Sequence, residues 1–148
     1  VMDRLHALLP DRFQLTPRLC RLSNGGYTDT EAPWISLGGT ASLADFSKVT
    51  HTSVDNRRFR LNLIIETQTP FEEFEWAGKH ICIGDVELEI IEPVGRCAAI
   101  NVDPNTADAS QNHLRTMLRI YGHTNFGMFA RIVKNGTLIE GANMHLTS

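Results

Sequence analysis

The sequence predicts a mainly β fold: a mostly antiparallel, closed β-barrel of about seven strands with two or three flanking α-helices. Apolar residues recur at every second position from Phe59 onward, which is the period of a strand with one buried face. Gly84-Asp85 and Asn135-Gly136 are typical of tight β-hairpins. Strands do not alternate regularly with long helices, so a parallel α/β sheet is not expected.

Length and composition predict one domain over residues 1–148. The chain is 42% hydrophobic and 21% charged, as is usual for globular proteins. No apolar run approaches the ~20 residues of a membrane span, and the first residues lack the apolar segment of a signal peptide. We therefore expect a cytoplasmic protein without membrane association. The formal net charge of −3 gives no indication of nucleic-acid binding.

The first half of the chain contains few predicted elements. Residues 1–31 show little pattern, with a candidate strand at residues 18–22. A short strand is expected at residues 34–37 and a helix at residues 40–49, where apolar residues recur every third position. A strand is then expected over residues 59–65.

The second half is dominated by strands and hairpins. Residues 70–78 are expected to form a turn or one helical turn, with Glu72, Glu73 and Glu75 facing solvent. A helix is expected at residues 108–121, with Asp108 as its cap. The expected strands are 79–83, 86–91, 96–102, 127–134, 137–140 and a last short one at 143–146.

The two hairpin turns fix which residues face each other. In the first hairpin, Ile81 is opposite Leu88 and Cys82 is opposite Glu87. In the second, Arg131 is expected to pair with Glu140 across the Asn135-Gly136 turn.

Arg60 and Asn62 lie on one face of the predicted strand 59–65 and form the first candidate site. A guanidinium grips anions, and an amide both donates and accepts, which suits the edge of a heterocyclic amide. The alternative is that Arg60 faces solvent and Asn62 caps a loop carbonyl.

Cys97 is the second candidate, because it follows Gly95 and Arg96 where a loop becomes a strand. A nearby guanidinium favours the thiolate, which is the nucleophilic and metal-ligating form. A lone thiolate suits a transition metal that is held mainly by a cofactor. The alternative is a small buried hydrophobe, which we expect for Cys20 and Cys82.

The polar loop 121–127 is the third candidate, and there His123 is expected to be a loop hydrogen-bonder rather than a catalyst.

In this order, the three segments resemble the MOSC domain, named after the C-terminal domain of molybdenum-cofactor sulfurases. The resemblance spans residues 32–146, whereas residues 1–31 have no counterpart of the N-terminal strand with which reductase members bind the cofactor phosphate. The matching stretches are Arg58 to Asn62 (RFRLN), Pro70 to Asp85, Glu92 to Thr106 and Tyr121 to Ala130.

The resemblance implies a β-barrel that binds the molybdenum cofactor (molybdopterin). As in the amidoxime-reducing members, Cys97 would be the catalytic residue and the molybdenum ligand. The implied reaction is reduction of N-hydroxylated or N-oxide-type small molecules, with electrons from a partner protein. The residues implied to bind the cofactor are Arg58, Arg60, Asn62, Gly95 and Arg96.

Two alternatives remain open. In other members the matching cysteine has been proposed to hold a persulfide, so Cys97 would carry sulfur from a desulfurase partner for metal–sulfur cluster or cofactor assembly. A third hypothesis is a non-catalytic module whose Arg60 face binds an anion or a partner protein.

Overall fold

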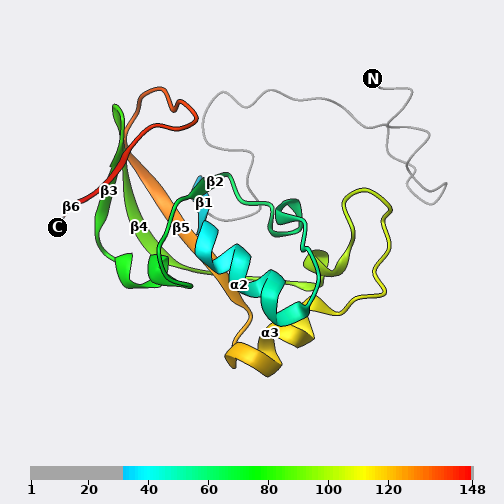
Figure 1. Cartoon of the computed structure of the whole chain (residues 1–148). Coiled ribbons are helices and arrows are strands. Elements are labelled where there is room, and N and C mark those ends of the chain that lie inside the picture. The colour runs from blue at the N-terminus through cyan, green and yellow to red at the C-terminus, as the bar shows by residue number, and fades with distance from the viewer. Residues whose placement is uncertain (1–31, 148) are drawn as a thin grey trace, which may run out of the picture. The chain divides into compact units, whose positions relative to one another are not determined.

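The computed structural model describes residues 32–147, which form a six-stranded mixed sheet, curled into a half-barrel, and two helices (Figure 1). The strand order is β2-β1-β5-β4-β3-β6. The strands are β1 (Ile35–Gly39), β2 (Leu63–Ile65), β3 (His80–Ile83), β4 (Val86–Gly95), β5 (Asn125–Lys134) and β6 (Met144–Thr147). The helices are α2 (Thr40–Thr50) and α3 (His113–Tyr121), with 3-10 turns η1 (Asn56–Phe59), η2 (Glu72–Trp76) and η3 (Ala98–Asn101). Within residues 32–147, no helix is long and apolar enough to cross a membrane.

The predicted mainly β fold is confirmed, whereas the predicted closed, mostly antiparallel barrel of about seven strands is wrong. β1 and β2 pair in parallel because α2 carries the chain back to the start of the sheet. β2 and β6 are the two edges of the described sheet and do not meet. The predicted strand 96–102 is mostly the turn η3, and residues 137–140 form no strand. The candidate strand at residues 18–22 lies outside the described residues.

The first predicted hairpin is confirmed and the second is wrong. Ile81 is opposite Leu88 and Cys82 is opposite Glu87, as the two-residue turn predicts. Arg131 pairs instead with Glu89, because β5 runs beside β4 for most of its length. The chain after β5 then returns to β3, where β6 pairs.

The segment 59–65 is a turn followed by a short strand. Phe59 ends η1, and Arg60 takes a left-handed backbone conformation with φ of 49°, so the extended chain begins only at β2. The predicted alternation of apolar and polar residues is nevertheless reflected in burial, because Phe59 and Ile65 are buried, whereas Arg60 and Asn62 are exposed. Similarly, the predicted helix 108–121 begins later than expected, because Asn112 rather than Asp108 caps it.

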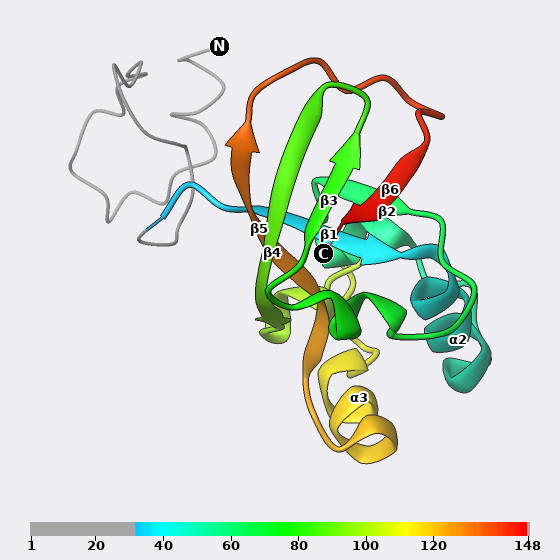
Figure 2. The same cartoon turned by 90° about the vertical axis from the view of Figure 1, so that its left-hand side faces the viewer.

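The core consists of two apolar clusters. One lies against the sheet and includes Leu37, Leu88 and Met128. The other lies between α2, α3 and the turns η1 and η3. Its buried members are Phe46, Phe59, Ile100, Met117 and Phe126. Figure 2 shows α3 at the end of the sheet where β4 ends and β5 begins.

Gly127 allows β1 and β5 to approach each other closely. Its φ is 73°, and a Cβ atom placed there would lie 2.3 Å from the Leu37 carbonyl oxygen. Only glycine combines that conformation with that contact. The residue therefore sets the spacing of β1 and β5 just beside Phe126.

Glu73 does not face solvent as expected; it is completely buried at the N-terminus of α2. Its carboxylate accepts hydrogen bonds from the Gly39 N–H at 3.1 Å and from the Ser42 hydroxyl at 2.9 Å. The Ser42 oxygen in turn accepts from the Phe71 N–H at 2.8 Å. A negative charge at this position also interacts favourably with the helix dipole. Glu73 thus fixes α2 to the η2 segment.

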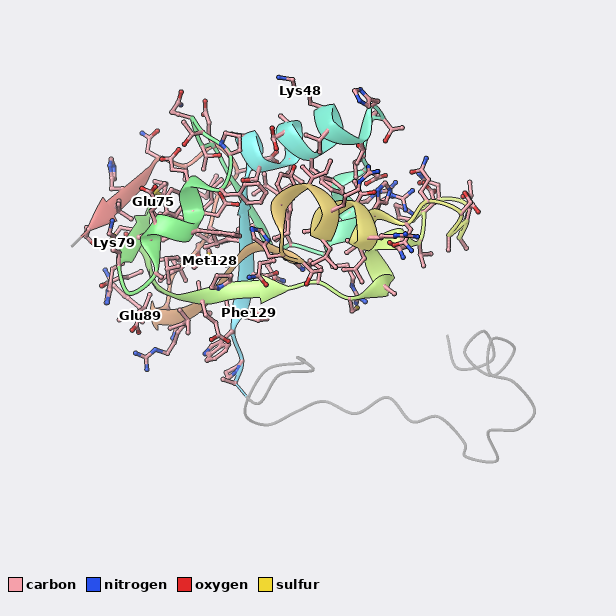
Figure 3. All side chains as sticks on the ribbon, turned by 90° about the horizontal axis from the view of Figure 1, so that it is seen from below. Lys48, Glu75, Lys79, Glu89, Met128 and Phe129 are labelled. Atoms are coloured by element: carbon pink, nitrogen blue, oxygen red, sulfur yellow. The ribbon has the colours of Figure 1, made fainter. Side chains whose placement is uncertain are left out.

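We expect Glu73→Ala to lower the free energy of unfolding by about 2–4 kcal/mol, because it leaves the buried Gly39 N–H without an acceptor. Glu75→Ala is the matched control, since Glu75 is exposed on the same turn (Figure 3), and it should change stability by less than about 0.5 kcal/mol. Urea unfolding measures both values. Equal losses in the two variants would contradict the role given to Glu73.

Candidate functional site

Cys97 lies directly after Arg96 at the point where the chain leaves β4, and it caps the turn η3. Its side chain is exposed, so the alternative of a small buried hydrophobe does not apply to it. Cys82, by contrast, is half-buried in the middle of β3. Cys20 lies outside the described residues. The two described cysteines therefore differ in how exposed they are.

Arg96 holds the base of the Cys97 segment by donating to backbone carbonyls of two other segments. Its Nη1 donates to the Phe59 oxygen at 2.7 Å, and its Nε donates to the Phe126 oxygen at 2.9 Å. Its own backbone N–H donates to the Thr124 oxygen at 2.9 Å. We call this set of contacts the Arg96 clamp. It brings three predicted segments together: the RFRLN segment, the Cys97 segment and the loop before β5.

The Arg96 clamp also places a positive charge beside the thiol. Burial lowers the pKa of Arg96 to about 10, and the negative charge of a Cys97 thiolate acts in the opposite direction. Arg96 therefore stays protonated at neutral pH. All three hydrogen bonds of the Arg96 guanidinium are with protein carbonyls. Arg96 therefore positions the backbone of the site and does not present an unengaged guanidinium to a ligand.

Arg58 holds the other end of the Cys97 turn, residues 97–101. Its side chain is 8% exposed, and its Nη2 lies 2.6 Å from Asp103 Oδ2. Its Nη1 donates to the Asn101 oxygen at 2.9 Å. The N–H groups of Asn105 and Thr106, and then the charge of Arg58, lower the pKa of Asp103, which keeps this pair ionised. Arg58 therefore also stabilises the Cys97 turn through contacts within the protein.

Arg60 and Asn62 differ in how much of each side chain is available. The Asn62 Oδ1 accepts from the Ser36 N–H at 2.9 Å and from the Ser36 hydroxyl at 3.1 Å, so this oxygen joins β1 to the residue before β2. The Arg60 side chain is exposed and makes no hydrogen bond or ion pair in the described part of the chain. Of the three predicted arginines, Arg60 is the one with an unengaged guanidinium.

Gly95 and the loop before β5 complete the arrangement. Gly95 pairs with Asn125, which brings the end of β4 against the start of β5. His123 Nδ1 accepts from the Asn125 N–H at 3.2 Å, which confirms its predicted role as a loop hydrogen-bonder. The sequence pattern predicted this loop as a candidate site. It could not predict that backbone carbonyls of the loop accept hydrogen bonds from Arg96, because every residue type has a backbone carbonyl. Over residues 32–147, no three His, Cys, Asp or Glu residues are grouped to hold a metal ion.

The fold and the site define a class of domain in which a mixed, curled β-sheet presents an exposed cysteine beside a half-buried arginine. The MOSC domain family matches residues 31–145, and the chain belongs to this family. The molybdenum cofactor sulfurase of Danio rerio is 39% identical over 74 residues, which are 49% of this chain and 9% of that protein. That of Drosophila melanogaster is 33% identical over 92 residues, 61% of this chain and 12% of that protein. The matched stretches thus span only about a tenth of the length of these relatives.

Two solved structures share the fold. YiiM from Geobacillus stearothermophilus has a TM-score of 0.58 at 16% identity, covering 77% of this chain and 54% of that one. YiiM from Escherichia coli has a TM-score of 0.56 at 14% identity, with the same coverage of 77% and 54%. At these identities the likeness concerns the fold alone.

We expect Arg96→Met to lower the free energy of unfolding by about 2 kcal/mol, because the carbonyls of Phe59 and Phe126 lose their donor. Arg115→Met is the control, since Arg115 is exposed on α3. Amide hydrogen exchange should speed up within residues 97–101 and 124–127 in the Arg96 variant. Unchanged exchange in both segments would contradict the Arg96 clamp.

Proposed function

We propose that this MOSC domain holds the molybdenum cofactor, with the Cys97 thiolate as the protein's ligand to molybdenum. The observation that supports this most directly is the Arg96 clamp, which fixes an exposed thiol beside the segment that bears Arg60. A thiolate is a ligand that molybdenum accepts, and a single one leaves most of the coordination to the cofactor. The names of the sulfurase relatives point to the same cofactor.

Arg60 and Asn62 are the residues that we propose to bind the anionic, heterocyclic part of the cofactor. The free guanidinium of Arg60 is suited to a phosphate or another anionic group. The Asn62 oxygen is engaged by Ser36, so only its NH₂ group remains to donate to a heterocycle. Gly95, Arg96 and Arg58 act on the cofactor through the shape of the Cys97 turn.

The reaction that we propose is reduction of N-hydroxylated or N-oxide-type compounds. Removing oxygen from such a substrate takes two electrons and two protons and releases water. The bound cofactor would supply the two-electron exchange, and a partner protein would supply the electrons. The protein's own residues hold the thiolate, bind the anionic part of the cofactor and keep the turn rigid.

The exposure of Cys97 also favours a second function, sulfur transfer. Its thiolate would attack the terminal sulfur of a persulfide on a desulfurase partner. A new S–S bond would form on Cys97, and the donor cysteine would leave as its thiolate, so that no oxidant is needed. This function is related to that named for the sulfurase relatives.

We expect Cys97→Ser to abolish molybdenum binding, and Arg60→Met to lower it about tenfold through loss of a charge-assisted contact. The protein is purified from a host that makes the cofactor, and metal and pterin are measured per chain. Cys82→Ser and Arg57→Met are matched controls, because Cys82 lies within β3 and Arg57 is already paired with Asp55. Equally low molybdenum in the wild type and in Cys97→Ser would contradict cofactor binding.

For sulfur transfer, we expect the wild type to gain one sulfur atom per chain on incubation with a desulfurase and cysteine, because an accessible thiolate accepts sulfane sulfur. Intact mass spectrometry measures the gain, and Cys97→Ser should show none. A gain that persists in Cys97→Ser would place the sulfur elsewhere. A Cys97→Ser protein that folds and keeps full cellular function would instead favour the non-catalytic module.

A further inference from the structure

His113 is a buried titratable residue that the proposed function does not use. It opens α3, and the whole residue is 4% exposed. Among the described residues, its Nε2 is the one buried side-chain nitrogen or oxygen with no hydrogen-bond partner. The ring lies against the Phe46 ring, with centroids 5.6 Å apart. A neutral imidazole tolerates this apolar environment, whereas a protonated one would have an unpaired donor there.

The charged groups on the neighbouring elements offer no compensation for a proton on His113. On η1, Arg57 is paired with Asp55, and Arg58 is paired with Asp103 of the loop after η3. On α2, Asp45 accepts from the Tyr121 hydroxyl of α3 at 2.7 Å. Lys48 lies on the outer side of α2 (Figure 3). Burial, and then the positive charge of Arg58, lower the pKa of His113 below its ordinary value of 6.5.

The elements around His113 are the ones that hold the Cys97 turn. The Leu114 N–H, next to His113, donates to Asn101 Oδ1 at 3.0 Å. Asn101 also ends η3, and its carbonyl accepts from Arg58. Ile100 of η3 is buried in the same cluster as Phe46. Movement of His113 away from Phe46 therefore disturbs the contacts that position the turn behind Cys97.

We propose that His113 makes the Cys97 turn acid-sensitive: protonation of its ring separates the start of α3 from η3 and loosens the site around Cys97. The site's role rests on the function proposed above, but the structural switch does not. We call the arrangement with His113 packed against Phe46 the closed state. The direction of the pH dependence follows because the His113 ring is neutral in this state. The closed state keeps its full stability above pH 6.5, and it loses stability as the pH falls below this value because the open state binds the proton.

The test is amide hydrogen exchange of the cofactor-free protein at pH 7.5 and pH 5, corrected for the intrinsic rates. We expect protection over residues 98–121 to fall, by at most about 30-fold, which is the ratio of protonated to neutral histidine at pH 5 for an ordinary histidine. Amides of β4 are the internal reference and should keep their protection. Constant protection over residues 98–121, or an equal fall in β4, would overturn the proposal.

His113→Phe places an aromatic ring that cannot titrate in the same apolar environment, and it should remove the fall in protection. His113→Gln is a second variant in case the first does not fold. His145→Gln is the control, since His145 is exposed on β6, and it should behave as the wild type. A fall that persists in either His113 variant would overturn the proposal.

An NMR titration of the wild-type histidines gives a second readout that needs no variant. Titration of His113 at the ordinary pKa in the closed protein would also overturn the proposal. Failure to load molybdenum at pH 7.5 would instead count against the proposed function alone.

Discussion

The structure around Cys97 depends on one half-buried cation, the guanidinium of Arg96. Three segments that are far apart in the sequence meet at this group: η1, the end of β4 and the start of β5. A single guanidinium satisfies carbonyls from two of them, because its donors form a rigid planar fork. Partial removal of a positive charge from water is costly, and here the hydrogen bonds to the carbonyls of Phe59 and Phe126 offset that cost.

The rest of the fold keeps this cation in place. Phe59 and Phe126 provide the two carbonyls, and their rings stack with centroids 3.9 Å apart in the second apolar cluster. α2 covers that cluster through Phe46, and Glu73 fixes the start of α2. The acceptors of the Arg96 clamp are therefore positioned by packing and not only by hydrogen bonds.

Local patterns predicted the parts of this fold that local interactions determine. The β3–β4 register follows from alternation and from a two-residue turn, and both lie within a dozen residues. The parallel pairing of β1 with β2 joins distant segments, and no local pattern encodes it. Asn135-Gly136 has the composition of a hairpin turn, but pairing of β6 with β3 takes precedence over it. Similarly, Glu73 and Glu75 look alike in sequence, and only the packing of α2 distinguishes them.

Local sequence also predicts some features of the candidate site and not others. Residue type and neighbours single out Cys97, but the sequence cannot distinguish three arginines whose surroundings differ, namely Arg58, Arg60 and Arg96. Gly127 extends this lesson to mutational data. It touches no candidate ligand group, yet any side chain there would collide with the Leu37 carbonyl beside the Arg96 clamp. Loss of function in a Gly127 variant would therefore report loss of the fold, and a parallel measure of protein abundance would distinguish it from an effect at Cys97.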